Sequence, residues 1–280
     1  MPAAPMRERS EFDEITRRLR RNIVTSTTKA GSGHPSTSLS MVEVMTVLYF
    51  GGVLRYNPED PGDPQRDRFI LSKGHGAPGL YATLAEAGYF PEADLQTLRQ
   101  LGSPLEGHPN MCRLPGVEAS TGSLGQGISI AIGHALAARI DGAGYRVYVM
   151  VGDGESEQGQ IWEALMYAGN QGLDSLTVIL DHNGYQQTGA VADIQPLDPI
   201  EGKFQAFGFA TRVINGHSLD EVSGAFEWAR GVSGKPQGII AKTVKGKGVS
   251  ILEAAPGKWH GKPVPPDEEA KALEEIGGRS

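Results

Sequence analysis

The sequence predicts an α/β protein: a doubly wound, mostly parallel sheet of five to six strands flanked by helices. Two observations support this fold class. Short apolar runs of strand length alternate with longer segments of helical periodicity, as in a series of βαβ units. The 280 residues are 39% hydrophobic and 21% charged, which is ordinary for a globular protein with a large core. We expect residues 1–10 to be disordered, residues 11–265 to form one domain and residues 266–280 to form a C-terminal tail.

Each element is predicted from its apolar spacing and from the residues that interrupt it. Phe12, Ile15 and Leu19, for example, share one face of a helix that ends at Gly31. The expected elements, in order, are helices at 12–30 and 39–49, a strand at 68–71, helices at about 77–88 and 91–101, a helix at 128–140, a strand at 146–151, a helix around 161–168, a strand at 175–180, a short helix before 208, a strand at 211–214, a helix at 219–230 and a strand at 238–244. The segments 102–116 and 181–199 are predicted as long loops, which usually carry function.

Charge and cysteine content exclude several classes of partner and site. The net charge of −7 argues against nucleic acid or an anionic membrane as a partner. A single cysteine, Cys112, excludes an internal disulfide and a cysteine-rich metal site, and it favours a reducing, cytoplasmic location. Neither a signal peptide nor a membrane-spanning run is visible, because the N-terminal segment is charged and no long apolar run occurs.

The most informative stretch is a strand–helix–strand unit in the middle of the chain. Its first strand ends at Gly152-Asp153-Gly154, and its second strand ends just before Asn183. Because a right-handed crossover makes the two strands parallel, Asp153 and Asn183 leave the same edge of the sheet. Their oxygen atoms and a backbone carbonyl near Tyr185 suit Mg²⁺, while the glycines and the following helix start favour a phosphate. The alternative is an ordinary βαβ unit with turn residues, and only the addition of Asn183 makes the pattern specific.

A second candidate for ligand binding is the glycine-rich segment 121–127, which opens a helix of small residues. Such a segment lets a flat or phosphorylated ligand approach the backbone closely. Tight packing between two helices is the alternative explanation for these small residues.

Histidine is the natural side chain for moving protons near neutral pH. Four of the seven histidines lie in glycine-flanked loops: His34, His75, His108 and His260. A single loop histidine is more often a hydrogen-bonding residue than a catalyst, but four of them favour a polar substrate channel. His134 lies within a helix and His217 beside a helix cap, which indicates structural roles, whereas His182 stays undecided between packing and function.

Six segments resemble the amino-terminal, diphosphate-binding domain of the transketolase family, and they occur in the family's order. Together they span nearly the whole chain. They are SGHP at 32–35, LSKGH at 71–75, GHP at 107–109, GVEASTGSLGQG at 116–127, GDGESEQGQIWEA at 152–164 and KTVKGKGVSILE with WHG between 242 and 261.

The resemblance implies a cofactor, thiamine diphosphate, and a bound Mg²⁺ or, in its place, Ca²⁺ or Mn²⁺. The implied metal ligands are Asp153, Asn183 and the carbonyl of Tyr185. The implied cofactor-binding residues are His75, Gly122, Ser123, Leu124, Gly152, Asp153, Gly154, Glu155, Asn183, Gln187 and His260. The thiazolium of this cofactor carries the carbanion, so the protein's task is placement and proton handling.

The same resemblance implies a reaction: transfer of a two-carbon ketol unit from a ketose (phosphate) to an aldose. The implied catalytic residues hold donor hydroxyls and shuttle a proton as the ketose C–C bond breaks. They are the four loop histidines His34, His75, His108 and His260.

Three departures from the family qualify this expectation. The chain stops where the pyrimidine-binding domain is expected, so we expect a second transketolase subunit that carries this domain, in a two-plus-two heterotetramer. Glu157 and Gln158 are exchanged relative to the family's GDGELQEG, which puts a carboxylate link between active sites in doubt. Gln187 stands where an apolar residue usually meets the thiazolium. These departures leave two alternatives open: a two-carbon transferase that uses a 2-oxo acid or an unusual sugar, and a non-catalytic, cofactor-binding regulatory subunit.

Overall fold

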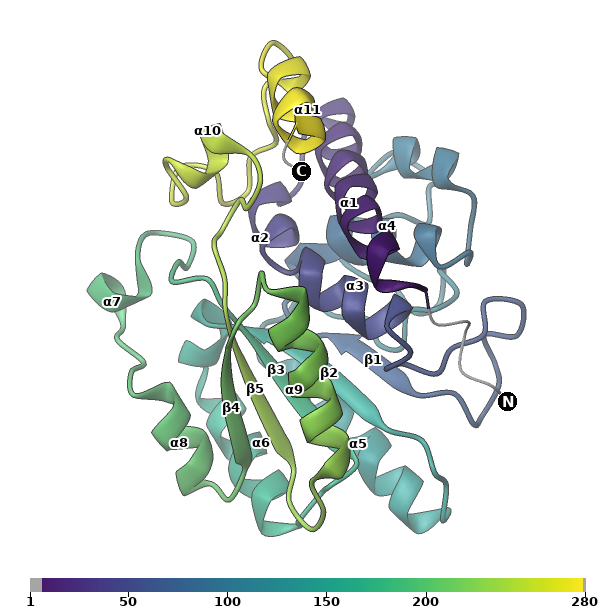
Figure 1. Ribbon diagram of the computed structural model, residues 1–280, viewed down its shortest axis with the longest axis vertical. Helices are drawn as coiled ribbons and strands as arrows, with labels where there is room; N and C mark the ends of the chain where they lie inside the picture. Colours follow the sequence, from purple (N-terminus) through teal and green to yellow (C-terminus); the bar gives the residue numbers. More distant parts are fainter. Residues whose placement is uncertain (1–6, 279–280) are drawn as a thin grey trace.

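The computed structural model describes residues 7–278 of the chain. Its centre is a sheet of five parallel strands in the order β1-β2-β3-β5-β4 (Figure 1). The strands are β1 (Arg68–Leu71), β2 (Val147–Gly152), β3 (Leu176–His182), β4 (Ala210–Asn215) and β5 (Gln237–Lys242). The predicted parallel α/β fold is therefore confirmed, with five strands.

Helices cover both faces of this sheet. The α-helices are α1 (Arg9–Ala30), α2 (Pro35–Ser40), α3 (Val42–Phe50), α4 (Ala77–Glu86), α5 (Gln126–Ile140), α6 (Gly159–Asn170), α7 (Val191–Ile194), α8 (Ile200–Ala206), α9 (Leu219–Gly231), α10 (Ser250–Glu253) and α11 (Glu269–Gly278). Because successive strand residues point to opposite faces, β2 contributes to two cores. Tyr148 and Met150 pack with α1, α3, α4 and α9, whereas Val149 packs with α5, α6 and α8. Figure 1 shows α9 in front of the strands.

Several helical segments differ from the prediction, among them the short helices α7 and α10, which were not predicted. The helix expected at 39–49 is two helices, α2 and α3, which meet at Met41, where the backbone leaves helical geometry (φ −98°, ψ 2°). The helix expected at 91–101 is a short 3₁₀-helix, η2 (Glu92–Thr97), which follows Pro91. Between β2 and α6 lies a further 3₁₀-helix, η3 (Gly154–Glu157), so the long helix of the central unit begins only at Gly159.

The two ends of the chain are more ordered than expected within the described part. Residues 1–6 of the predicted disordered segment lie outside the described residues, and α1 already begins at Arg9. The expected C-terminal tail contains α11, whose Ala272 and Ile276 are buried in the same core as α1 (Figure 1). Among residues 7–278, no helix has both the length and the apolar character needed to cross a bilayer.

Candidate active site

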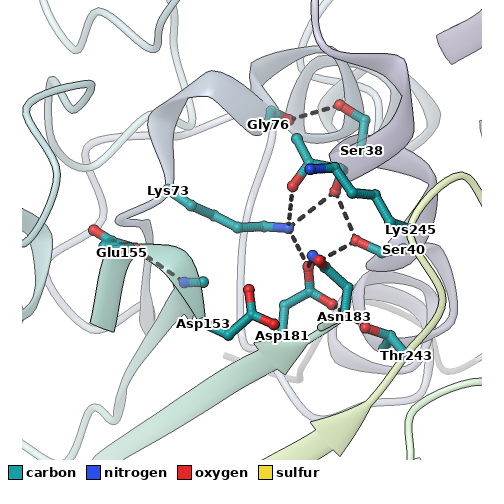
Figure 2. A network of polar contacts seen from close by, with 12 residues as sticks. Ser38, Ser40, Lys73, Gly76, Asp153, Glu155, Asp181, Asn183, Thr243 and Lys245 are labelled. Carbon is teal, nitrogen blue, oxygen red and sulfur yellow. Dashed lines mark hydrogen bonds and ion pairs between the residues drawn. The ribbon is translucent and has the colours of Figure 1, made fainter. Parts of the chain in front are cut away.

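Loops from four strands meet at the carboxyl edge of the sheet. Lys73 follows β1, Asp153 follows β2, Asn183 follows β3 and Lys245 follows β5. Since β1, β2, β3 and β5 are consecutive neighbours and all parallel, their loops open at one edge, where α/β sheets bind ligands. Asp153 and Asn183 lie close together there, as the crossover argument predicted (Figure 2).

Asp153 is a buried carboxylate that is held by backbone N–H groups. Its Oδ1 accepts the Gly154 N–H at 2.8 Å, and its Oδ2 accepts the Gly184 N–H at 2.5 Å. Among residues 7–278, no lysine or arginine nitrogen lies within 4.0 Å of it. Burial, and then the charge of Asp181, raises the pKa of Asp153 to about 7. A carboxylate in this position suits a metal ion, which would supply the missing positive charge.

Asn183 is held with its amide in one orientation. Its Nδ2 donates to Oδ2 of Asp181 at 3.0 Å, and its Oδ1 accepts the Tyr185 N–H at 3.1 Å. The described residues contain no cluster of three or more His, Cys, Asp or Glu side chains that could hold a metal by themselves. A metal at Asp153 and Asn183 would therefore complete its shell with a carbonyl, water or phosphate oxygens, which suits Mg²⁺.

A buried ion pair between Lys73 and Asp181 lies beside Asp153 (Figure 2). The Lys73 ammonium also donates to the Thr37 carbonyl at 2.9 Å and to its hydroxyl at 3.0 Å. Asp181 accepts further hydrogen bonds from Ser40 at 2.7 Å and Thr243 at 2.5 Å. Burial opposes ionisation of Asp181, but the Lys73 charge and these hydrogen bonds outweigh it and lower its pKa. The pair fixes the ends of β1 and β3 relative to each other.

Lys245 provides a second buried cation at the site. Its Nζ donates to Nδ1 of His260 at 2.8 Å and to the Gln186 carbonyl at 3.3 Å. Burial lowers the pKa of Lys245 to about 8. Because a charged lysine is only a donor, Nδ1 of His260 accepts and the imidazole proton lies on Nε2.

Three of the four predicted catalytic histidines form one cluster. The ring centroids of His34 and His75 are 5.3 Å apart, those of His34 and His260 are 5.3 Å apart, and those of His75 and His260 are 5.4 Å apart. Burial lowers the pKa of His34 to about 4 and that of His260 to about 3, and it also lowers the pKa of His75. All three rings are therefore neutral near pH 7, and each can both donate and accept a hydrogen bond.

His108 lies apart from this cluster but close to the glycine-rich segment. A Cβ added to Gly122, whose φ is +144°, would lie 2.9 Å from the His108 ring. Glycine at 122 thus permits the close approach of the two loops. Gly127, in contrast, lies against Ser72, whose Cβ would be 2.6 Å from an added Cβ, so here the small residue serves packing. The packing at Gly127 is between a helix and a loop and not between two helices, and the approach of a ligand to this segment stays a prediction.

Glu155 joins three of the loops around the site. Its Oε1 accepts the Ser72 hydroxyl at 2.5 Å and the Gly125 N–H at 2.8 Å, and its Oε2 accepts the Gly152 N–H at 3.0 Å. The carboxylate is buried, and burial raises its pKa even against these three hydrogen bonds. Its contacts therefore position the cavity wall.

Most of the predicted site residues line one cavity. They are His34, His75, Gly122, Leu124, Gly152, Asp153, Gly154, Glu155, Asn183, Tyr185, Gln187 and His260. Ser123 and His108 do not line it, and His108 borders a neighbouring cavity with Arg99 and Arg113. Glu157 and Gln158 also line the main cavity, and one Glu157 carboxylate oxygen is buried without a hydrogen-bond partner among the described residues.

Sequence reasoning missed Lys73, Lys245 and Asp181. Each follows a strand predicted from the sequence. Lys73 and Asp181 also stand two residues before the predicted site residues His75 and Asn183, whereas Lys245 is 15 residues from the nearest one, His260. His217, one of the two histidines that we interpreted as structural, has structural contacts. His217 contacts Glu43 at 3.0 Å and accepts the Val244 N–H at 2.8 Å. His182 lies 3.4 Å from the Lys242 ammonium and does not line the cavity.

Comparison with known proteins places the chain among thiamine diphosphate-binding domains. Residues 12–279 match the family described as transketolase, thiamine diphosphate binding domain. The chain is 48% identical over 225 residues to the 6-deoxy-6-sulfo-D-fructose transketolase subunit SqwG of Clostridium sp. (strain MSTE9), covering 80% of this chain and 82% of that protein. It is 42% identical over 267 residues to an apulose-4-phosphate transketolase subunit of Actinobacillus succinogenes, covering 95% of this chain and 96% of that protein.

Solved structures agree with these sequence comparisons. The transketolase from Campylobacter jejuni superposes with a TM-score of 0.90 at 34% identity, covering 97% of this chain but 43% of that one. The chain likewise spans 41% of the length of the mammalian transketolases that it matches.

Proposed function

Since the chain belongs to the transketolase family through its thiamine diphosphate-binding domain, we propose that it is the diphosphate-binding subunit of a two-component transketolase. The reaction moves a two-carbon ketol unit from a ketose to an aldose. One observation carries the proposal: Asp153, Asn183, Lys245 and three neutral imidazoles face a single cavity at the carboxyl edge of the sheet.

Thiamine diphosphate fits this cavity because its two ends need different surroundings. A diphosphate needs cations, and Lys245 and a metal at Asp153 and Asn183 would supply them. We propose that this metal is Mg²⁺. When bound, the cofactor supplies the carbon that takes up negative charge as a ketose C–C bond breaks. Leu124 and Gly122 offer an uncharged wall for its ring.

The histidine cluster is suited to hold and move protons of a polyhydroxylated substrate. A neutral ring accepts a hydroxyl proton at one nitrogen and donates at the other. In His260, the Lys245 contact fixes Nδ1 as the acceptor, so Nε2 carries the proton toward the cavity's other groups. In His34, Nδ1 is buried without a hydrogen-bond partner in the described part of the chain. Nε2 is therefore the His34 nitrogen that we propose meets a substrate hydroxyl.

We further propose a partner that carries the pyrimidine-binding domain, in a two-plus-two assembly. The support is that two relatives, covered by this chain over 82% and 96% of their length, are named as transketolase subunits. Those relatives are also named for a sulfonated and a phosphorylated sugar. A ketose with an anionic group at its far end is therefore the donor that we propose to test first.

The decisive experiment mixes this chain with the subunit that carries the pyrimidine domain, in the presence of thiamine diphosphate and Mg²⁺. Ketose phosphates, 6-deoxy-6-sulfo-fructose and pyruvate are offered as donors, with several aldoses as acceptors. We expect release of an aldose two carbons shorter than the ketose donor. Turnover with pyruvate alone would favour a 2-oxo acid as donor, and no release of aldose from any ketose would overturn the proposal.

The metal site is tested separately by calorimetry of cofactor binding with Asp153→Asn. The substitution removes the charge that a divalent cation needs, so we expect the Mg²⁺-dependent part of thiamine diphosphate binding to be lost. The exposed Asp94→Asn serves as the matched control and should bind like the unsubstituted protein. If Asp153→Asn still binds thiamine diphosphate in a Mg²⁺-dependent manner, the metal site does not include Asp153.

A further inference from the structure

Arg99 has an unusual backbone conformation. It is the single non-glycine residue with positive φ (57°) in the described part of the chain, and its N–H donates to the Leu105 carbonyl at 2.8 Å. Side chains other than glycine adopt this region at a cost in free energy. Such a conformation persists where the surroundings impose it, and it occurs often at functional sites.

The Arg99 guanidinium connects two loops that carry predicted catalytic histidines. Its Nη1 donates to the Ser32 hydroxyl at 2.8 Å, and its Nη2 donates to the Gly107 carbonyl at 3.3 Å. Ser32 lies two residues before His34, and Gly107 lies immediately before His108. An added Cβ on Gly107 would lie 3.0 Å from the guanidinium carbon, so the group lies directly against this backbone.

No carboxylate neutralises this guanidinium among residues 7–278, and its Nε is buried without a hydrogen-bond partner there. Arg113, in the same loop region, pairs instead with Glu106 at 2.7 Å. Burial, followed by the charge of Arg99, lowers the pKa of both His34 and His108.

We propose that Arg99 is a positioning residue for ketol transfer, which ties the Ser32 loop to the Gly107 loop and so fixes His34 relative to His108. The role deepens the proposed function and rests on it. Arg99 does not line the main cavity, so it acts through the two histidines and not by touching the cofactor.

The test compares variants of Arg99 in the complete two-subunit complex, with kcat, KM for the ketose and Kd for thiamine diphosphate measured for each. Arg99→Gln should lower kcat/KM for the ketose tenfold or more and leave the cofactor Kd within twofold. Arg99→Lys should recover part of the loss, because one ammonium replaces the charge but cannot span both acceptors. Arg113→Gln is the matched control and should stay within twofold of the unsubstituted complex.

Two further variants separate positioning from loss of folding. Arg99→Gly suits the positive φ, so it should unfold no earlier than Arg99→Gln and should lose activity to the same extent. Ser32→Ala removes one acceptor, and adding it to Arg99→Gln should cause little further loss, because both changes break the same link.

The outcomes distinguish this role from the proposed function. If the unsubstituted complex turns over and Arg99→Gln and Arg99→Gly have the same kcat/KM as Arg113→Gln, the role of Arg99 is overturned but the proposed function is not. Losses for Ser32→Ala and Arg99→Gln that multiply independently would also overturn it. Absence of ketol transfer by the unsubstituted complex would overturn the proposed function and this role together.

Discussion

The Lys73 ammonium group lies in the protein interior and is surrounded by oxygen atoms of Asp181 and Thr37. Two charges removed from water are costly, and removing one of them leaves the other uncompensated. We expect Lys73→Met to lower the free energy of unfolding by about 3–5 kcal/mol, measured by urea denaturation. Pairing it with Asp181→Asn should recover part of this loss, because no buried charge then remains alone.

An exposed ion pair provides the control for this prediction. Arg17 contacts Glu14 at 3.1 Å on the surface of α1. Such pairs contribute about 0–1 kcal/mol, so Arg17→Ala should leave stability nearly unchanged. A Lys73→Met protein as stable as Arg17→Ala would contradict the importance of the buried pair.

The sequence predicts the individual site residues unevenly. Histidines next to glycines and the Gly-Asp-Gly turn combine residue types that suit proton transfer and ligand binding, so they stand out without any knowledge of contacts. Lys73 does not, because a lysine after a short strand usually lies at the surface, and its partner is 108 residues further along the chain. Arg99 is similar, since one of the acceptors of its guanidinium, Ser32, lies 67 residues earlier in the chain.

Helix α5 contains two glycines whose surroundings differ. Gly127 lies against Ser72 with no space for a Cβ, whereas Gly133 has no atom within 4 Å of an added Cβ. We expect Gly127→Ala to cost about 1–3 kcal/mol through overpacking. Gly133→Ala should instead stabilise by about 0.5–1 kcal/mol, since alanine favours a helix interior. Thermal unfolding of the two variants checks both signs, and equal shifts would contradict the packing difference.

A buried Arg20–Glu43–His217 network joins α1, α3 and the loop after β4. Arg20 contacts Glu43 at 2.5 Å, and its Nε donates to the Lys247 carbonyl at 3.2 Å, near Lys245. Burial opposes ionisation of Glu43, but the Arg20 charge and the His217 hydrogen bond outweigh it and lower its pKa from 4.5. A carboxylate whose pKa is lower in the folded state than in the unfolded state stabilises the fold at pH values above its unfolded-state pKa. This stabilisation is lost as the pH falls through the folded-state pKa.

This network predicts a loss of stability in acid. The contribution of Glu43 should be complete above pH 4.5 and should decline as the pH falls further. Glu43→Gln cannot ionise, so its unfolding free energy should be lower at neutral pH and flatter across the acid range. Urea denaturation at a series of pH values measures both slopes, and parallel slopes would contradict the assignment.

At the level of elements, the sequence predicts strands better than helix boundaries. Buried parallel strands are continuous apolar runs, which made β1, β2, β3 and β5 identifiable. β4, at the edge of the sheet, is largely exposed and carries no such run. The break between α2 and α3 is a backbone change at Met41 within an unbroken apolar pattern. Apolar spacing reports which face is buried and carries no information on such a local change.

The last helix of the chain, α11, packs against the first helix, α1. Ile276 is 3% exposed and Ala272 is 2% exposed, and both belong to the core that α1 covers. Ile276→Ala should lower the free energy of unfolding by about 2–5 kcal/mol. Ile140, which is 82% exposed, is the control and should tolerate the same change within about 0.5 kcal/mol. Chemical denaturation compares them, and equal losses would contradict the packing of α11.

The overall architecture follows from the sequence because parallel topology is strongly constrained. Strand–helix alternation and right-handed crossovers leave few arrangements, and the ligand edge then follows. Docking of α11 does not, since a short charged helix near the end of a chain resembles a solvated tail until its partner surface is known.

The hydrogen bonds of Glu155 bear on how fast a ligand binds. A single carboxylate joins Ser72, Gly125 and the end of β2 at Gly152 through hydrogen bonds within this chain. Because these hydrogen bonds are internal to the protein, a ligand that binds in the cavity needs to order little of the cavity wall. We expect encounter, and not loop rearrangement, to limit how fast the pyrophosphate moiety is taken up.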